Sequence, residues 1–314
     1  MKPTQHFTSL ILLFAISLLS FSQENLSSIN YQELISENQI LNDEISTNLF
    51  VGKTAGNHGV SATGAFSYNV PISIPEGIMG MQPNLSINYS SQGRNGILGY
   101  GWGLGGLSSI YRSSKTLFTD QIVDGFKLNN DDAFSWDGNR LIATSGFNGE
   151  NNTEYGTEAE SFARIISHGQ LGPGSGPEWF EVELKSGLIM EYGRTIDSRQ
   201  IGVDGFAAIV WKLNKTMDRN GNYVMYNYTI INNEHLLSSI SYTGTQGTSP
   251  FININFAYQE RTDQNSIYTG NFGTEIMSKH LLTQIDVVLA ATSERIKKYE
   301  FKYGFDRYSF LNEI

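Results

Sequence analysis

Short segments of alternating apolar and polar residues follow one another from residue 60 to the end of the chain, with tight-turn dipeptides between several of them. A period of two places neighbouring side chains on opposite faces of a sheet. The clearest pair, 207–213 and 223–228, is separated by Asn220-Gly221, a strong hairpin signal because both central residues can adopt a positive φ. Two further hairpin turns are expected at Asp137-Gly138 and Ser186-Gly187. The pattern predicts an all-β fold of antiparallel hairpins in a large, curved, shell-like sheet with turns rich in Gly and Tyr.

A glycine-rich stretch runs from Gly96 to Arg112, with six glycines in its first eleven residues. Part of it, 101–106, matches the dinucleotide-binding pattern G-x-G-x-x-G. That pattern holds a pyrophosphate only where a helix follows the glycines, and here 107–112 alternates like a strand. No cofactor is therefore expected. The glycines are predicted instead to let the backbone turn sharply beneath bulky side chains, at Gly99, Gly101 and Gly103.

Three aromatic side chains are predicted to anchor the core. Two of them interrupt the glycine-rich stretch and the third lies in the segment before Asn220-Gly221. They are Tyr100, Trp102 and Trp211.

The N-terminus has the features of a secretory signal peptide. Lys2 and His6 precede the apolar run 10–19, and the small residues Ser20 and Ser22 stand where a signal peptidase cleaves. The run is too short for a membrane anchor, which needs about 20 apolar residues. The sequence thus predicts a signal peptide over 1–22, cleavage near Ser22 and a secreted, extracellular protein without membrane insertion.

The rest of the chain divides into a polar N-terminal tether, 23–59, and a β-rich domain, 60–314. The Gly- and Pro-rich loop 169–177 is the best internal boundary. Strand-like alternation continues to Ile314, so we expect an open sheet edge there. Either the chain is the front part of a longer Rhs/YD-type polypeptide, or a partner covers the edge.

Charge and cysteine content exclude several classes of function. The formal net charge is −10, with 21 Lys and Arg against 31 Asp and Glu. This argues against nucleic acid and anionic membranes as partners, since both are bound through positive patches. The chain has no cysteine, which excludes disulfides, thiolate metal sites and a cysteine nucleophile.

No metal site is expected. The histidines are scattered and none forms an H-E-x-x-H motif. Asp218 to Asn222 begins like a calcium loop, but the sixth position is Tyr223 instead of Gly and the twelfth is Thr229 instead of Glu. A hairpin turn explains this segment better than weak surface calcium binding.

Catalytic residues are likewise not predicted. Glu158 with Glu160, and Glu181 with Glu183, are spaced like the carboxylate pairs of glycosidases. Alternate residues of a strand share one face, and that face is usually solvated. A glycosidase-like enzyme requires two carboxylates that face each other across a cleft, and it remains the less favoured alternative.

Three segments together carry a family resemblance. The first leads from 60–75 through 83–91 to Asn95-Gly96, Gly99, Gly101-Trp102, Ile110 and Arg112; the second spans 180–193; the third spans 211–228. These segments resemble the N-terminal domain shared by the Salmonella plasmid virulence protein B and the B component of insecticidal toxin complexes. The third segment also resembles YD (Rhs-type) repeats.

The resemblance implies a non-catalytic β-rich module. In toxin complexes such a domain precedes a β-propeller and helps to build a hollow Rhs shell around a toxic polypeptide. In the virulence protein it precedes a separate ADP-ribosyltransferase domain. Neither a propeller nor a transferase is recognisable in this chain, so no catalytic residue is carried over.

The sequence thus predicts a secreted structural module that shapes a shell or scaffold. Its partner would be a downstream or separate Rhs/toxin-type polypeptide, joined by continuation of the sheet edge. A secreted adhesin or glycan-binding module is the alternative, and exposed aromatic residues on one sheet face would indicate it. The residues singled out have structural roles: Gly99, Gly101, Trp102, Gly103, Arg112, Trp211, Asn220 and Gly221.

Overall fold

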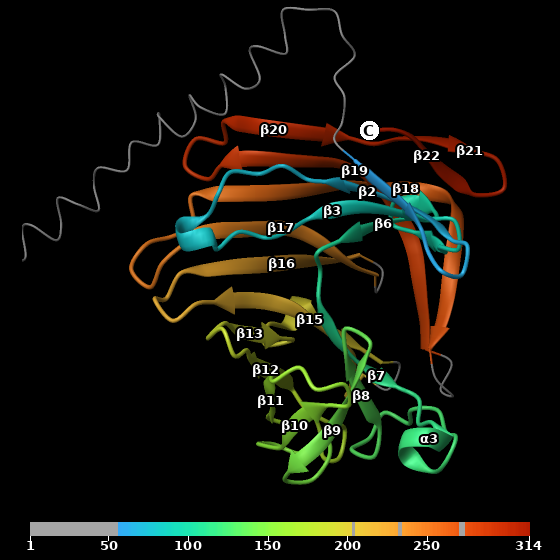
Figure 1. Ribbon diagram of the computed structural model, residues 1–314, viewed down its shortest axis with the longest axis vertical. Helices are drawn as coiled ribbons and strands as arrows, with labels where there is room; N and C mark the ends of the chain where they lie inside the picture. Colours follow the sequence, from blue (N-terminus) through green and yellow to red (C-terminus); the bar gives the residue numbers. More distant parts are fainter. Residues whose placement is uncertain (1–55, 203–204, 232–233, 270–273) are drawn as a thin grey trace, which may run out of the picture. The chain divides into compact units, whose positions relative to one another are not determined.

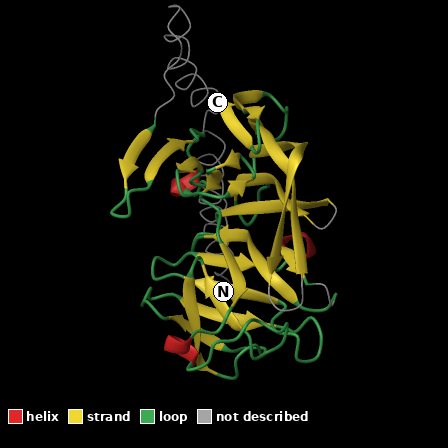
Figure 2. Cartoon of the chain, turned by 90° about the vertical axis from the view of Figure 1, so that its right-hand side faces the viewer, coloured by secondary structure: helices red, strands yellow, loops and turns green. Residues whose placement is uncertain are grey.

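The computed structural model describes residues 56–202, 205–231, 234–269 and 274–314. The predicted signal peptide and most of the predicted tether lie outside these ranges. The described part is almost entirely antiparallel β-structure (Figures 1 and 2). The predicted all-β fold with a large shell-like sheet is therefore confirmed.

Eight antiparallel strands form a closed barrel. The long strand β15 closes the ring, because its residues 210–212 pair with β7 and its residues 213–217 pair with β13. The barrel strands are β7 (Ser109–Ser113), β8 (Ala133–Trp136), β9 (Asn139–Ser145), β10 (Glu154–Thr157), β11 (Arg164–His168), β12 (Trp179–Glu183), β13 (Ile189–Tyr192) and β15 (Ala208–Met217).

Strand β15 also begins an open sheet. Beyond the barrel the order continues as β15-β16-β17-β18-β19-β20. Figure 1 shows these strands side by side, in yellow to red. They are β16 (Tyr223–Ile231), β17 (Glu234–Gly244), β18 (Ile252–Thr269), β19 (Thr274–Leu289) and β20 (Arg295–Glu300).

A four-stranded sheet packs against the open sheet. Two hydrogen bonds tie the layers: the Tyr242 hydroxyl donates to the Pro75 carbonyl oxygen over 2.9 Å, and the Ser73 amide donates to the Tyr299 hydroxyl over 2.8 Å. Apolar residues of both sheets belong to one core cluster with the barrel interior. The strands are β1 (Asn57–Val60), β2 (Phe66–Pro71), β3 (Ser86–Ser90) and β6 (Trp102–Gly105).

Short elements complete the fold. Helix α3 lies between β7 and β8, and strand β14 pairs with β15. Two small hairpins, β4-β5 and β21-β22, form separate two-stranded sheets. The bounds are β4 (Asn95–Gly96), β5 (Gly99–Tyr100), α3 (Leu117–Asp120), β14 (Arg199–Ile201), β21 (Lys302–Phe305), β22 (Ser309–Glu313), and the 3-10 turns η1 (Ile78–Gly80) and η2 (Ile196–Ser198).

The three predicted hairpins are all present. Asp137 and Gly138 connect β8 to β9 with φ of 46° and 91°, as a two-residue turn of the predicted type requires. Ser186-Gly187 connects β12 to β13. The loop 169–177 joins β11 to β12, two strands that pair within the barrel.

The turn at Asn220-Gly221 differs in detail from the expectation. The hairpin forms, with Met217 opposite Tyr223, but only Gly221 of the two central residues has a positive φ (79°). The Asp218 carboxylate accepts hydrogen bonds from the Asn220 and Asn222 amides, at 2.8 and 2.9 Å. A longer turn that ends in a left-handed glycine suits a hairpin of this length.

Two of the glycines examined in the sequence have positive φ, and one does not. Gly101 has a φ of 81°, and a Cβ there would lie 2.6 Å from the Tyr89 ring and 2.9 Å from the Ser90 carbonyl oxygen. At Gly99, where φ is 86°, a Cβ would lie 2.5 Å from the Ser309 carbonyl oxygen. At Gly103 a Cβ would meet nothing within 4 Å. The geometry therefore gives a reason for glycine at 99 and 101 and none at 103.

We expect Gly101→Ala to lower the free energy of unfolding by about 1–2 kcal/mol, because alanine is strained in the left-handed region and its methyl group would meet Tyr89. Gly103→Ala is the matched control in the same segment, and it should change stability by less than about 0.5 kcal/mol. Urea denaturation measures both variants. Equal losses in the two variants would contradict this account.

Candidate functional site

Aromatic side chains fill the barrel, and Trp211 of β15 lies at their centre. Its ring meets Phe134 at 5.6 Å and Phe180 at 5.0 Å between centroids, both edge to face. Its Nε1 donates to the carbonyl oxygens of Pro177 and Glu178, at 3.2 and 3.1 Å. Trp211 is fully buried. Edge-to-face packing of this kind stabilises a core beyond simple area burial.

The backbone at Gly193 lies close to the Trp211 ring. A Cβ at Gly193, where φ is 70°, would lie 2.4 Å from the Trp211 ring. Tyr192, the preceding residue, points its hydroxyl at Ser108 Oγ (2.7 Å) and accepts a hydrogen bond from Trp136 Nε1 (2.9 Å). Burial raises the pKa of Tyr192 well above its usual value, so this phenol stays neutral and hydrogen-bonded.

Arg112 brings a positive charge into this aromatic interior. Its guanidinium carbon lies 5.4 Å from the Phe134 centroid and 5.6 Å from that of Trp211. Its Nη1 forms an ion pair with Asp132 Oδ2 at 2.6 Å, and both side chains are almost completely buried. A buried charge needs such a partner, together with further hydrogen bonds, to remain ionised.

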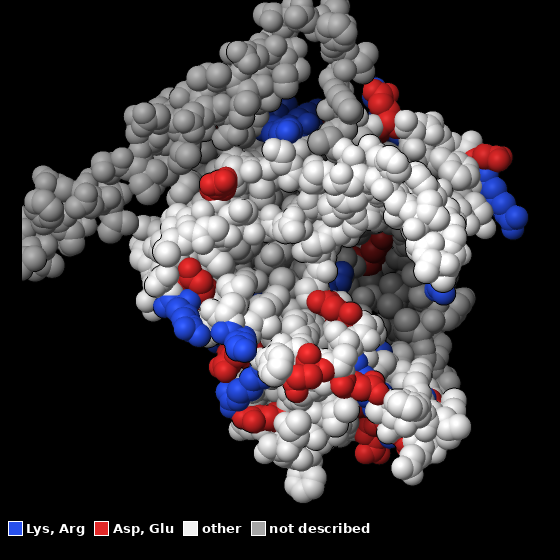
Figure 3. Space-filling model, viewed as in Figure 1, with Lys and Arg blue, Asp and Glu red and all other residues white. Residues whose placement is uncertain are grey.

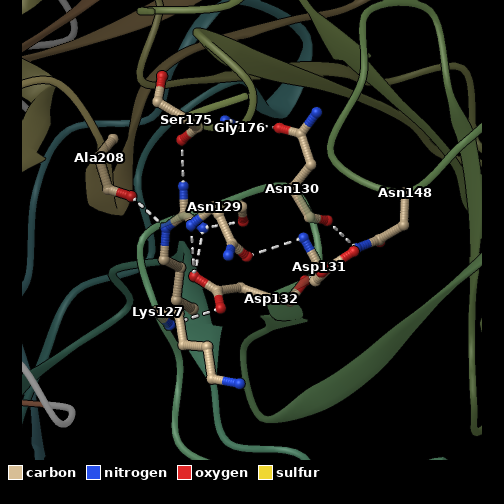
Figure 4. A network of polar contacts seen from close by, with 10 residues as sticks. Lys127, Asn129, Asn130, Asp131, Asp132, Asn148, Ser175, Gly176 and Ala208 are labelled. Carbon is tan, nitrogen blue, oxygen red and sulfur yellow. Dashed lines mark hydrogen bonds and ion pairs between the residues drawn. The ribbon is translucent and has the colours of Figure 1, made fainter. Parts of the chain in front are cut away.

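Backbone oxygens supply the further hydrogen bonds of Arg112 (Figure 4). Its Nε donates to the Ala208 carbonyl oxygen and its Nη1 to that of Asn129, both at 2.7 Å, and its Nη2 donates to that of Ser175. Asp132 in turn accepts from the Lys127 amide at 2.6 Å. One guanidinium thus connects β7, β15, the loop before β8 and the loop 169–177.

Sequence reasoning singled out Arg112 but missed its partner. Asp132 ends the run Asn129-Asn130-Asp131-Asp132, whose composition indicates an exposed turn. Asn130 and Asn148 extend the network: the Asn130 carboxamide oxygen accepts from the Gly176 amide, and Asn148 Nδ2 donates to the Asp132 carbonyl oxygen. Only the fold shows that such a polar turn lies over a buried arginine.

The glycine-rich stretch is held by a second buried charge cluster. Arg261 of β18 donates from Nε to Asp263 Oδ1 (3.0 Å) and from Nη1 to the Gly96 carbonyl oxygen (3.0 Å). Asp263 also accepts from Asn95 Nδ2 at 3.1 Å and from Ser309 Oγ at 2.6 Å. The cluster joins the β4-β5 hairpin to β18 and β22.

Burial by itself would raise the pKa of Asp263. Hydrogen bonds from Arg261, Ser309 and Asn95 outweigh that effect and hold the pKa far below its usual value. Because the folded-state pKa is depressed, the contribution of Asp263 to stability is complete above pH about 4 and is lost at lower pH.

The two aromatic residues of the glycine-rich stretch are less buried than Trp211. Trp102 is half-buried and packs on Tyr89, with 5.1 Å between ring centroids. Tyr100 is 37% exposed and stacks on Tyr308. The prediction that Tyr100 anchors the core is wrong, because β5 lies in a small outer hairpin whose ring partner comes from the β21-β22 hairpin.

The first pair of candidate carboxylates lies on a strand of the barrel. Glu181 and Glu183 alternate with buried Phe180 and Val182 on β12, so they lie on the outer face of the barrel. Glu183 pairs with Arg164 at 3.3 Å. Burial, reinforced by the neighbouring carboxylates Glu183 and Glu191, raises the pKa of Glu181.

The other carboxylate pair lies in the loop after β10. Glu158 and Glu160 are both exposed; Glu158 accepts from Thr119 Oγ1, and Glu160 accepts from the Phe162 amide. In the part of the chain that the structure describes, no group of three His, Asp or Glu residues is arranged to hold a metal ion. The same part contains no helix long and apolar enough to cross a membrane.

Positive and negative side chains are interspersed on the face of the molecule in Figure 3, without a patch of one sign. This face is also hollowed, and charged side chains are visible in the depth of the hollow.

Together, the closed barrel, the open sheet that continues from it and the buried arginine clusters define an all-β module built around a rigid aromatic core. Residues 60–272 match the family described as Salmonella virulence plasmid 65kDa B protein. The match covers more than half of the chain, so the chain belongs to this family. The resemblance to the Salmonella plasmid virulence protein B family is therefore confirmed, and the likeness of 211–228 to YD repeats stays a prediction.

Solved structures share the fold. The N-terminal domain of the effector protein SpvB from Salmonella typhimurium strain LT2 matches with a TM-score of 0.62 and 19% identity, over 77% of this chain and 96% of that one. The TcdB2-TccC3 crystal structure matches with a TM-score of 0.65 and 16% identity, over 84% of this chain. The Photorhabdus luminescens Tc holotoxin pore matches with a TM-score of 0.66 and 16% identity, also over 84% of this chain.

The chain spans only 16% of the TcdB2-TccC3 chain. It also covers 16% of the matched chain in the holotoxin pore structure. No curated protein matches the chain in a sequence search.

We expect Asp132→Asn to lower the free energy of unfolding by about 3–5 kcal/mol, because it removes the buried carboxylate that pairs with the Arg112 guanidinium. The control is Glu313→Gln, which removes one partner of the exposed Lys302–Glu313 pair and should leave stability almost unchanged. Urea denaturation at pH 7 compares the two variants. A loss no larger in Asp132→Asn than in the control would show that the buried pair does not stabilise the barrel.

Proposed function

We propose that this chain is a non-catalytic structural module of a secreted, toxin-like protein, and that it forms part of a β-shell or scaffold for another polypeptide. The family match and the shared fold with TcdB2-TccC3 support this function. The interior of the barrel is filled by interlocking aromatic rings, as suits a supporting element.

The observation that carries the proposal is the outer edge of the open sheet. Among the described residues, β20 pairs with β19 and with no other strand. An unpaired edge presents backbone donors and acceptors to any strand that can add to it. We infer that an Rhs- or toxin-type polypeptide, downstream or separate, continues the sheet here.

The side chains of β20 fit this role. Lys297, Lys298 and Arg295 make the edge strand basic in an otherwise acidic chain. Arg295 pairs with Asp286, and Lys298 pairs with Glu300. Charged side chains on an edge strand prevent indiscriminate pairing.

A photo-crosslinking side chain placed at Lys298 in the full-length, exported protein tests this edge. We expect a covalent adduct with an Rhs- or toxin-type polypeptide, because the partner strand would lie beside β20. The same substitution at Lys185, in the β12-β13 turn, is the matched control and should give no such adduct. The adduct is identified by mass spectrometry.

If the exported protein is recovered as a monomer and Lys298 cross-links to no polypeptide, the edge proposal is wrong. Equal cross-linking from both positions would also contradict it, because contact would then not be specific to β20.

One observation favours the alternative of a glycan-binding module. Tyr68, Tyr89 and Trp102 lie opposite one another across β2, β3 and β6, and all three are half-buried. Phe66, 42% exposed, flanks them at 6.3 Å from Tyr89. Such a ladder resembles the aromatic platforms on which sugar rings stack. Glycan-array binding that disappears in Trp102→Ala would favour this alternative over a scaffold alone.

A further inference from the structure

A pocket of about 230 Å³ lies where the glycine-rich stretch passes over the strands that join the barrel to the open sheet. One wall comes from this stretch, with the apolar side chains of Ile97, Leu104 and Leu107. The other wall comes from β15 to β18 and includes Lys212 and Tyr228. The pocket is mainly apolar, and Lys212 is the one lysine or arginine among the described residues that line it.

Lys212 follows Trp211 on β15, so the two side chains point to opposite faces of the strand. Trp211 enters the barrel, and Lys212 lines the pocket on the other side. Its Nζ donates to the His235 carbonyl oxygen at 2.6 Å and lies 5.1 Å from the Tyr228 ring centroid. An ammonium has three donors, and this bond uses one of them.

No carboxylate forms an ion pair with Lys212 among the described residues. The charge of Glu234 favours the ammonium form of Lys212 from a distance. Glu234 Oε2 itself is bound to His280 Nδ1 at 2.6 Å and to the Lys279 amide at 3.0 Å. Lys212 therefore differs from Arg112 and Arg261, which have carboxylate partners in the fold.

Among the described residues, the histidine and the two tyrosines that line the pocket supply no negative charge, and the Asp197 carboxylate near them accepts a hydrogen bond from the Tyr228 amide. Burial lowers the pKa of His235, whose Nδ1 lies 3.0 Å from the Asp197 carbonyl oxygen. The Tyr228 and Tyr258 hydroxyls donate to the carbonyl oxygens of Leu213 and Leu237, and burial raises the pKa of both phenols. These groups stay neutral near pH 7.

We propose that this pocket binds a small carboxylic acid with an apolar body, such as a short fatty acid or an aromatic acid, whose carboxylate pairs with Lys212 Nζ. The hydrocarbon part would lie against Ile97, Leu104 and Leu107. The ligand provides the counter-charge that the fold itself does not place beside Lys212, and such charge-assisted hydrogen bonds are among the stronger polar contacts.

The proposal predicts a specific dependence on pH. Burial lowers the pKa of Lys212 to about 8, so the empty pocket loses its positive charge in mildly alkaline solution. A bound carboxylate favours the ammonium and raises that pKa. Binding at pH 8.5 should therefore take up a proton, and affinity should fall as the pH rises above 8.

Octanoate is the probe, measured by isothermal titration calorimetry on the full-length protein at pH 7 and 8.5. Lys212→Met keeps the apolar stem without the charge, and we expect it to weaken octanoate binding by about tenfold or more. Lys215→Met, on the same strand but not among the residues that line the pocket, is the matched control and should bind like the wild type. Octanol should bind the wild type much more weakly than octanoate does.

Leu107→Trp provides a second test, because it narrows the pocket without touching the charge; it should also reduce octanoate binding. The proposal is overturned if folded wild-type protein does not bind octanoate, or if Lys212→Met binds it as tightly as the wild type does. Octanol binding equal to that of octanoate would show that the charge has no role.

Discussion

The pairing of β15 with β7 and β13 on the barrel side, and with β16 beyond, is the constraint on which the rest of the structure depends. One strand closes a barrel and begins an open sheet, so the two parts share a continuous set of backbone hydrogen bonds. Trp211 secures the shared strand from inside, through edge-to-face contacts with Phe134 and Phe180 and hydrogen bonds to the end of the loop 169–177. A strand held in this way transmits the rigidity of the barrel to the sheet.

Buried arginines supply hydrogen-bond donors to carbonyl oxygens in the interior. Long loops leave carbonyl oxygens facing the interior, and these need donors. Arg112 supplies donors to two such oxygens, those of Asn129 and Ser175, and to that of Ala208 at the start of β15, and it pairs with Asp132. Arg261 donates to the Gly96 carbonyl oxygen of the β4-β5 hairpin and pairs with Asp263. The loops are thereby fixed to the strands without disulfides, in a chain that has no cysteine. Lys212 is the contrasting case, since its charge faces a pocket.

Local signals predicted much of this fold. The turns at Asp137-Gly138, Ser186-Gly187 and Asn220-Gly221 follow from dipeptide chemistry and two-residue periodicity. The closure of the barrel could not be predicted from the sequence. Residues 109–111 pair with 210–212, about a hundred positions away, and no local pattern encodes such a pairing. Burial of Asp132 was missed because its neighbours have turn composition. Tyr100 was misplaced because an aromatic residue between glycines can pack on an outer hairpin as well as in a core. The Lys212 pocket forms only when segments distant in the sequence meet.

Hydrogen exchange of Trp211→Ala, followed by mass spectrometry, tests most directly whether β15 makes the barrel and the open sheet one cooperative unit. Removing the indole leaves a cavity at the centre of the barrel. The account predicts that peptides from β10–β12 and from β16–β17 lose protection to a similar extent. The control Phe118→Ala, at a side chain that is 90% exposed, should leave both regions as in the wild type. If β16–β17 keep wild-type protection in Trp211→Ala while the barrel strands lose theirs, the two parts fold independently and the account is contradicted.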